Sequence, residues 1–320
     1  MRQRDWKRLK AMVAKLTFAQ RQTLKEELVA AGDAAASLEV IEGTGRLQTC
    51  PHCQSDAVVR NGSANGLQRY KCRHCHRTFN ALTGTPLARL RQKSKWLTQA
   101  EALRDGSSIT QAAKRLTVAR STAFRWRHRF LALPKAIQAQ ALVGIAEADE
   151  AFFLHSRKGQ RKLDREPRQR GGRAAKRGLS KEQVPVLVAR DRSGATANFI
   201  LAADGKADLV AALKPLLPSD TILCTDGSSV LAAAIKEIGV THRPVNVSAG
   251  QRVIAGVYHI QNVNAFDSRL KNWIRRFQGV ATKYLDSYLG WFRTLDRSAT
   301  TGLAPASLLA LAVGHRPILS

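Results

Sequence analysis

Residues 145–153 read IAEADEAFF, and this stretch decides the fold of the second half of the chain. Its apolar and small residues predict a β-strand, yet it carries three acids, Glu147, Asp149 and Glu150. A second short apolar run, TILCT at 221–225, ends directly at Asp226. An acid at the centre of one strand can meet an acid at the end of another across a sheet. We therefore expect Asp149 and Asp226 to lie close together.

A pair of carboxylates offers the hard oxygen ligands that Mg²⁺ prefers, and two such ions about 3.5–4 Å apart promote in-line phosphoryl transfer. The predicted helix at 259–277 adds Asn264, Asp267 and Lys271, whose i, i+3, i+7 spacing places them on one face. An amide or carboxylate oxygen there can complete a metal site, with Lys271 beside the scissile phosphate. The simpler alternatives are a strand-end aspartate that forms a turn and an ordinary polar helix face.

The sequence around these acids alternates between strand and helix patterns. Strands are predicted at 143–153, 184–190 and 195–201, and helices at 206–217, 228–238, 259–277 and 281–295. This pattern predicts a mixed α/β domain over residues 141–300, followed by a C-terminal tail at 301–320. A basic insert at 155–178, with ten Lys or Arg against two acids, interrupts the domain after its first strand.

Two C-x-x-C pairs define a separate region, predicted as a zinc ribbon over residues 46–80. Cys50 and Cys53 are followed after 18 residues by Cys72 and Cys75, which is the spacing of a structural zinc site. Four free or redox-active cysteines are the alternative, and a neighbouring histidine can replace a cysteine as ligand (His52, His74 or His76). The fifth cysteine, Cys224, lies in an apolar strand and is expected to be buried.

Residues 81–140 are predicted to form a helix-turn-helix domain. A capped helix at 108–116 is followed by a turn at 117–119 and a second helix at 120–130. Apolar residues of the second helix share one face, and its N-terminal half presents the residues predicted to contact bases in the major groove: Arg120, Ser121, Thr122 and Arg125. An ordinary pair of basic amphipathic helices is the alternative.

The first 45 residues are predicted to form two helices and a linker. Apolar residues recur at helical spacing up to residue 31, and Thr17 with Gln20 forms a capping-box pattern that restarts the helix. The small and polar stretch at 30–45 predicts the linker. The whole chain is therefore expected to combine α+β and α/β parts in several domains.

The charge of the chain points to a polyanionic partner. Lys and Arg number 52 against 24 acids among 320 residues, a net charge of +28, and 18 of the basic residues lie within 46–140. Hydrophobic residues make up 44%, which excludes a disordered basic tail. The absence of a long apolar run or signal-type segment and the few cysteines argue against membrane, extracellular and disulfide-scaffold classes.

From about residue 47 to 295 the chain resembles bacterial insertion-sequence transposases of the DDE type, specifically the ISXO-like group with an N-terminal zinc ribbon. The resemblance rests on the cysteine pairs and on the motifs at 147–150 (EADE), 225–227 (TDG), 259–271 (HIQNVNAFDSRLK) and 277–285 (FQGVATKYL). It implies an RNase H-like catalytic fold, structural Zn²⁺ and catalytic Mg²⁺ or Mn²⁺. It also implies double-stranded DNA as partner, at inverted repeats and target, a homodimer or larger assembly on DNA, and a cytoplasmic, nucleoid-associated location.

The resemblance further implies a catalytic set of Asp149, Asp226 and Asn264, followed by Lys271. Much of the group has a glutamate five positions after the histidine and seven before the lysine, where this chain has Asn264. Asp267 is the alternative third residue.

The function expected from the sequence is DNA transposition. The zinc ribbon and helix-turn-helix would bind terminal inverted repeats, and the second half would cleave and join DNA strands. A DNA-binding regulator derived from a transposase and a structure-specific nuclease are the alternatives.

Overall fold

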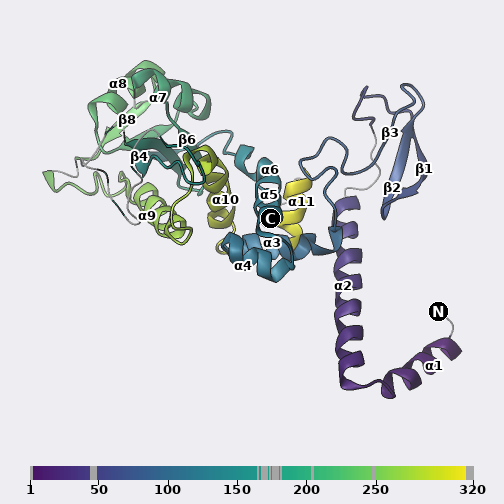
Figure 1. Ribbon diagram of the computed structural model, residues 1–320. Helices are drawn as coiled ribbons and strands as arrows, with labels where there is room; N and C mark the ends of the chain where they lie inside the picture. Colours follow the sequence, from purple (N-terminus) through teal and green to yellow (C-terminus); the bar gives the residue numbers. More distant parts are fainter. Residues whose placement is uncertain are drawn as a thin grey trace. The chain divides into compact units, whose positions relative to one another are not determined.

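The computed structural model describes residues 3–43, 49–163, 166, 172, 174, 180, 182–202, 205–246 and 249–314 (Figure 1). The chain divides into two compact units, Met1–Leu133 with Leu303–Ser320, and Pro134–Gly302. Within the described ranges, no helix is both long and apolar enough to cross a membrane.

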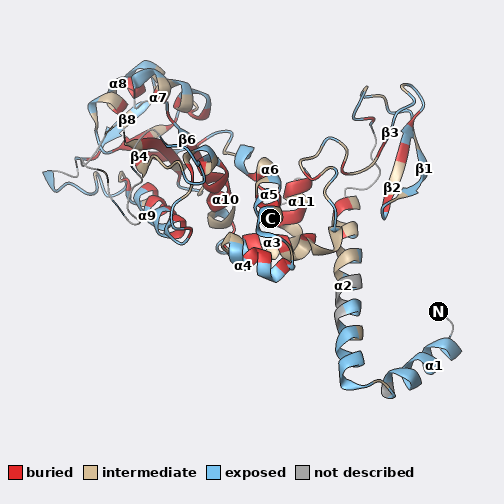
Figure 2. Cartoon of the chain, viewed as in Figure 1, coloured by how far each residue is buried: buried red, intermediate tan, exposed pale blue. Residues whose placement is uncertain are grey.

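The first unit begins with two helices, α1 (Gln3–Ala14) and α2 (Phe18–Glu42). The predicted capping box is present, because the backbone N–H of Gln20 donates to Thr17 Oγ1 at 3.3 Å and that of Thr17 donates to Gln20 Oε1 at 2.9 Å. The predicted linker at 30–45 is wrong for most of its length, since α2 continues to Glu42. Its alanines have the highest helix propensity of all residues, and this outweighs the lack of an apolar stripe. Figure 2 shows that α1 and the first half of α2 are largely exposed.

The cysteine region folds as a three-stranded antiparallel sheet of β1 (Val58–Ala64), β2 (Leu67–Cys72) and β3 (Thr78–Phe79). The two-residue turn between β1 and β2 has positive φ at both Asn65 (54°) and Gly66 (79°). Asn-Gly is the residue pair that this hairpin turn favours, so the local sequence explains the fold.

The helix-turn-helix also forms as predicted. After a 3-10 turn (Lys93–Lys95) the chain continues as α3 (Trp96–Arg104), α4 (Ile109–Leu116), α5 (Arg120–Phe130) and α6 (Ala132–Ala136). Ser108 caps α4 in a box with Gln111. The predicted C-terminal tail instead contains α11 (Pro305–Val313), which packs against α3 and α5 within the first unit. Its apolar face, with Leu308 and Leu309 buried, explains why the segment does not stay free.

The second unit contains a five-stranded mixed sheet in the order β6-β5-β4-β7-β8. Its strands are β4 (Ile145–Leu154), β5 (Gln183–Asp191), β6 (Thr196–Ile200), β7 (Ile222–Thr225) and β8 (Thr241–Pro244). Strand β5 is antiparallel to its neighbours, whereas β4, β7 and β8 are parallel. This strand order is that of the RNase H-like fold, as expected. Most of the basic insert at 155–178 lies outside the described residues.

Helices cover both faces of this sheet (Figure 1). On one face, α7 (Lys206–Leu213), a 3-10 turn (Lys214–Leu216) and α8 (Ser229–Ile238) pack over Ala146, Ala148 and Leu223. On the other face lie α9 (Gln261–Arg275), a 3-10 turn (Thr282–Tyr284) and α10 (Leu285–Arg297). Because side chains alternate along β4, this second face receives Glu147 and Asp149.

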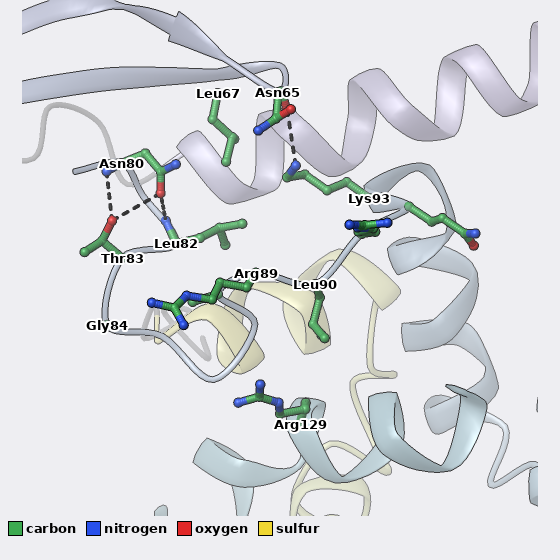
Figure 3. Close-up of a pocket in the computed structure, with 13 residues that line it drawn as sticks. Asn65, Leu67, Asn80, Leu82, Thr83, Gly84, Arg89, Leu90, Lys93 and Arg129 are labelled. Atoms are coloured by element: carbon green, nitrogen blue, oxygen red, sulfur yellow. Dashed lines mark hydrogen bonds between the residues drawn. The ribbon is translucent and has the colours of Figure 1, made fainter. Parts of the chain in front are cut away.

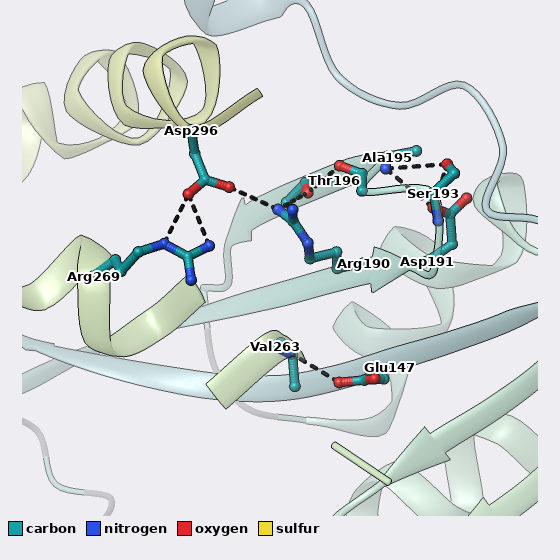
Figure 4. A network of polar contacts seen from close by, with 10 residues as sticks. Glu147, Arg190, Asp191, Ser193, Ala195, Thr196, Val263, Arg269 and Asp296 are labelled. Atoms are coloured by element: carbon teal, nitrogen blue, oxygen red, sulfur yellow. Dashed lines mark hydrogen bonds and ion pairs between the residues drawn. The ribbon is translucent and has the colours of Figure 1, made fainter. Parts of the chain in front are cut away.

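Helix α9 is held in place along its length. In Figure 4, Asp296 of α10 bridges Arg269 of α9 and Arg190 of β5, with Oδ–Nη distances of 2.8 Å to each. Aromatic rings pack α9 on α10, with Trp273 edge-on to Trp291 at 4.8 Å between centroids. Beyond the helix, Lys158 Nζ donates to the carbonyls of residues 277, 278 and 279 at 2.8–3.2 Å. The rotation of α9 about its axis is thereby fixed.

Candidate active site and metal centres

The four cysteines of the zinc ribbon converge on one point. Their sulfur atoms all lie within 4.8 Å of one another, with Cys50 Sγ 3.7 Å from Cys75 Sγ and Cys53 Sγ 3.6 Å from Cys72 Sγ. Zinc–sulfur bonds of about 2.3 Å in a tetrahedron place the sulfurs about 3.8 Å apart, so the cluster fits Zn²⁺. All four ligand positions are taken by cysteine, which is the arrangement of a structural site.

The pKa values of these thiols are also consistent with a cation bound between them. Backbone N–H groups, first that of Cys75, lower the pKa of Cys72 to about 6. A hydrogen bond from the backbone of Ser55 lowers the pKa of Cys53, but burial and the three neighbouring thiols together raise that pKa to about 12. Thiols this close cannot all ionise unless a cation balances their charge.

The two aspartates predicted to meet are brought together by the register of the sheet. Strands β4 and β7 pair in parallel with Glu147 opposite Cys224. Two residues further along are Asp149, within β4, and Asp226, which directly follows β7, and the charge of Asp226 acts on Asp149, so the two carboxylates meet near the carboxyl end of β7. Asp226 Oδ1 accepts from the backbone N–H of Ser228 at 2.9 Å, which orients its carboxylate at the start of α8.

The environment of Asp149 favours a bound cation. Burial, with a smaller contribution from the charge of Asp226, raises the pKa of Asp149 to about 6, although the N–H of Glu150 and the charge of Lys271 act to lower it. The N–H of Glu150 donates to Asp149 Oδ1 at 2.9 Å. A carboxylate held beside another in a partly buried place is unfavourable as an anion, and a divalent ion offsets that cost.

The predicted face of α9 is only partly as expected. Asn264 and Lys271 are exposed, whereas Asp267 is buried with 5% of its surface accessible. Burial raises the pKa of Asp267 to about 7, with Lys271 lowering it and Asp149 raising it. Asp267 Oδ1 has no hydrogen-bond partner among the described residues. The partly buried carboxylate of Asp149 beside the charge of Asp226 is a donor set that fits a divalent cation such as Mg²⁺.

A buried glutamate connects the first strand to α9. Glu147 Oε2 accepts from the backbone N–H groups of Asn262 and Val263 at 2.8 and 2.9 Å, at the first turn of the helix (Figure 4). Its other oxygen lies 2.9 Å from Arg192 Nη1 and 3.3 Å from His259 Nδ1. Since Glu147 and Asp149 are two residues apart on one strand, the glutamate fixes where α9 stands relative to the aspartate.

The helix-turn-helix leaves its predicted DNA-facing residues accessible. Ala123, Trp126 and Phe130 are buried, while Arg120, Ser121 and Arg125 are exposed and Thr122 is half-buried. The first turn of α5 is therefore free to approach DNA, as this motif requires.

A basic cavity of about 980 Å³ lies elsewhere in the same unit (Figure 3). Arg89, Arg91 and Lys93, on the segment between ribbon and helices, line it together with Arg129 of α5. No acidic residue is among the lining side chains that the structure describes. Lys93 Nζ donates to the carbonyl of Asn65 at 3.2 Å, which ties this segment to the ribbon hairpin.

Roles for Glu147, Arg192 and the basic cavity were not predicted from the sequence. The basic residues at every second position from 89 to 93 are the sequence feature that could have indicated this cavity. Glu147 and His259 belonged to recognised motifs, but nothing in the sequence indicated that they meet. The expected burial of Cys224 is confirmed.

Comparison with known families assigns three regions. Residues 141–293 match the ISXO2-like transposase domain, residues 48–76 the InsA N-terminal domain, and residues 88–133 a homeodomain-like domain. The three matches follow one another in the order expected from the sequence.

Similar proteins include two from mobile elements. The chain is 28% identical over 249 residues to "Uncharacterized protein in transposable element ISH50" of Halobacterium salinarum, covering 76% of this chain and 83% of that protein. It is 36% identical over 77 residues to "Insertion element iso-IS1N protein InsA" of Shigella dysenteriae, and the match covers 24% of this chain and 82% of that protein.

Solved structures with remote similarity include a simian T-cell lymphotropic virus intasome in complex with PP2A regulatory subunit B56 gamma (TM-score 0.29, 11% identity, 69% of this chain and 76% of the other). A pre-cleavage Mos1 transpososome gives a TM-score of 0.21 at 14% identity, and the match covers 65% of this chain and 79% of the other. The fold assignment rests on the sheet order rather than on these values. From its domain matches, the chain carries an ISXO2-like DDE transposase domain, preceded by an InsA-type zinc ribbon and a homeodomain-like helical domain.

Proposed function

We propose that this protein is an insertion-sequence transposase that binds terminal inverted repeats and catalyses metal-dependent cleavage and strand transfer of DNA. One observation carries the proposal: the register of β4 and β7 sets Asp149 beside Asp226 within the transposase domain, under a helix that brings Lys271 to the same place.

The proposed catalytic residues are Asp149, Asp226, Asn264 and Lys271. Asp149 and Asp226 would hold Mg²⁺ or Mn²⁺, and the family pattern puts Asn264 at the third position. A metal held there would supply the chemistry of activating a water or a 3′-hydroxyl as nucleophile and of stabilising the leaving oxygen. Lys271 is exposed and within electrostatic reach of Asp149, so its ammonium is available to a phosphate oxygen of the DNA strand.

Recognition of the element ends is assigned to the first unit. Arg120, Ser121, Thr122 and Arg125 on the first turns of α5 would read bases in the major groove of double-stranded DNA. The zinc held by Cys50, Cys53, Cys72 and Cys75 would keep the ribbon folded, and it takes no part in the reaction.

The basic cavity extends this interface to the DNA backbone. Arg89, Arg91 and Arg129 present three guanidinium groups with no acid among the described lining residues, which suits phosphate oxygens rather than base edges. The basic insert at 155–178 is proposed as a further clamp on DNA, on the strength of its charge alone.

Cleavage and joining at two element ends needs two active sites, so we propose at least a homodimer on DNA. A protein that acts on chromosomal DNA would work in the cytoplasm at the nucleoid.

The DNA flanking the gene gives the first test. Terminal inverted repeats around the gene and a short duplication of target sequence are expected. The full-length protein with Mg²⁺ should then nick a duplex carrying one repeat end and join the freed 3′ end to a target plasmid. Specific binding without any nick would favour the regulator, and cutting of branched DNA without joining would favour the nuclease.

A further inference from the structure

We propose that His242 of β8 is a positioning residue for the proposed reaction, because it holds Asp226 in place through the hydroxyl of Thr225. The inference rests on the proposed function, since it concerns an aspartate that the proposed reaction uses. It gives a role to β8, the edge strand of the sheet, to which neither metal binding nor DNA recognition has been assigned.

Asp226 needs support from its neighbours because its own side chain is exposed. It directly follows Thr225, the last residue of β7. An exposed side chain at the end of a strand can occupy several rotamers unless hydrogen bonds select one of them. The backbone turn that carries Asp226 therefore determines where its carboxylate points.

Two hydrogen bonds hold this turn, one on either side of the carboxylate. Thr225 Oγ1 accepts from the backbone N–H of Gly227 at 3.1 Å. Asp226 Oδ1 accepts from the backbone N–H of Ser228 at 2.9 Å. A threonine or an aspartate that accepts from the N–H two residues further on stabilises a tight turn. Gly227 has a φ of 82°, and a Cβ added there would lie 3.3 Å from Cβ of Pro244 in β8, so this turn requires glycine.

Strand β8 supports the turn from the side. It pairs in parallel with β7, with His242 opposite Leu223, and the N–H of Val245 donates to the carbonyl of Thr225 at 2.8 Å. His242 Nε2 lies 2.9 Å from Thr225 Oγ1. One hydroxyl therefore contacts both the backbone that follows Asp226 and a side chain of the neighbouring strand.

The burial of Thr225 indicates which way its hydroxyl proton points. Thr225 is completely buried, so its hydroxyl needs an acceptor within the protein. Among the described residues, His242 Nε2 is the acceptor in reach. Burial lowers the pKa of His242, which favours the neutral ring that can accept this bond. When the proton is donated to His242, a lone pair of Thr225 Oγ1 stays directed at the N–H of Gly227.

This arrangement affects the free energy of metal binding more than that of folding. Without His242 the hydroxyl of Thr225 can rotate, and its bond to Gly227 weakens. The carboxylate of Asp226 then samples more orientations, and an ion binds it less tightly because binding has to fix it. Groups that orient metal ligands typically change metal affinity or activity about 10–100-fold.

The test measures binding of Mn²⁺ to the full-length protein, by electron paramagnetic resonance of the free ion, together with DNA cleavage in Mg²⁺. Thr225→Val and His242→Ala remove the proposed contact. Thr225→Ser keeps the hydroxyl, and His242→Gln keeps a polar group that can accept from it. Asp220→Asn is the control, since Asp220 is exposed and precedes β7, at the opposite end of the strand from Asp226.

We expect Thr225→Val and His242→Ala each to weaken Mn²⁺ binding and slow cleavage about tenfold, while Thr225→Ser and His242→Gln stay within about threefold of the wild type. Asp220→Asn should equal the wild type. The double variant Thr225→Val/His242→Ala should lose no more than Thr225→Val alone, because the histidine acts through the hydroxyl.

Full Mn²⁺ affinity in both Thr225→Val and His242→Ala would overturn the inference and leave the proposed function intact. Losses that add in the double variant would also overturn it, since the histidine would then act by another route. If Thr225→Val fails to fold, the comparison of His242→Ala with His242→Gln decides, because His242 is only half-buried. A wild type that binds the repeat end and Mn²⁺ without cleaving would instead contradict the proposed function, and the Mn²⁺ affinities would still test the role of His242.

Discussion

The zinc ribbon and the carboxylate site both gather metal-binding side chains, but over very different lengths of chain. The four cysteines come from 26 consecutive residues, and one hairpin brings them together. Asp149 lies in β4 and Asp226 directly after β7, 77 positions apart in the sequence. The first site depends on local turns, and the second depends on sheet register and on the docking of α9.

This difference has a physical consequence for what each site does. The cysteine site is closed and its ligands stabilise a fold too small to hold itself together. The carboxylate site is part of a domain that has its own apolar core, so the fold does not need the metal. Its acids are instead held in a place that costs free energy until a cation arrives.

Disrupting the ribbon should have the largest effect and should separate the two sites. Cys72→Ser is expected to abolish stoichiometric zinc and unfold the ribbon, since zinc contributes roughly 10–16 kcal/mol to such small domains. Sequence-specific DNA binding should be lost, while Mn²⁺ binding at the carboxylates persists. Mass spectrometry measures the zinc content, and a Mn²⁺ titration measures binding at the carboxylates. Loss of Mn²⁺ binding in this variant would mean that the sites are not independent.

Loosening the glutamate that anchors α9 should have the next largest effect. Glu147→Gln keeps an acceptor for the helix amides but loses the charge that pairs with Arg192. Groups that orient metal ligands typically change activity or metal affinity 10–100-fold, and a loss of this size is expected in both strand cleavage and Mn²⁺ affinity.

The matched control is Glu237→Gln, which breaks an exposed ion pair with Lys206 on the other face of the sheet. Exposed ion pairs contribute little to stability, so the activity of the Glu237→Gln variant should equal that of the wild type. Equal losses in the two variants would contradict a positioning role for Glu147.

Changing the pH should affect stability through the carboxylate site, with a smaller effect than Glu147→Gln. The direction of this effect follows from the raised pKa values. The pKa values of Asp149 and Asp267 are raised to about 6 and about 7, so the neutral forms are favoured in the folded protein. Their contribution to stability is present below about pH 4 and is lost as the pH rises through 6 and 7, by roughly 1.4 kcal/mol per group and pH unit at most.

Mn²⁺ binds the ionised acids, so its stabilising effect should be large at pH 8 and nearly absent at pH 5. Melting curves with and without Mn²⁺ at the two pH values provide the measurement. A larger metal-induced shift at pH 5 than at pH 8 would contradict the assignment. The cysteine ribbon should be destabilised at low pH instead, because protons compete with zinc for its thiolates.

The smallest expected effect concerns the basic cavity beside the ribbon. Replacing Arg89 and Arg91 together by Ala should lower DNA affinity evenly for all sequences. The slope of log affinity against log salt concentration should also become shallower by about 1.8, because each phosphate that is no longer neutralised accounts for about 0.9. Lys236→Ala on α8 is the control, and fluorescence anisotropy at several salt concentrations is the measurement. An unchanged slope would exclude the cavity from the DNA interface.

Much of the fold was predictable because short stretches of sequence determine it. The Asn65-Gly66 turn, the capping residues Thr17 and Ser108, and the cysteine spacing each specify their structure within a few residues. The meeting of Asp149 and Asp226 was also predictable, since the acids stand at the centre and the end of apolar strands.

The remainder depends on contacts that no local pattern contains. Strand β8 is short and polar (THRP), and it is a strand only because β7 supplies a partner. The burial of Asp267 rather than Asn264 follows from the rotation of α9, which Glu147 and the aromatic contacts with α10 determine. Helix periodicity places Asn264, Asp267 and Lys271 on one face, but it does not say which of them turns inward.

The proposed transposition depends on DNA cleavage at the site around Asp149 and Asp226. Single-turnover cleavage of a duplex carrying one terminal repeat, with Mg²⁺, compares the wild type, Asp149→Ala, Asp226→Ala and the control Asp220→Asn. The wild type and the control should nick the repeat end. Both alanine variants should bind the DNA normally and cleave it at least about a thousandfold more slowly, the order expected for loss of a metal-activating carboxylate. Undiminished cleavage by Asp149→Ala would contradict this assignment.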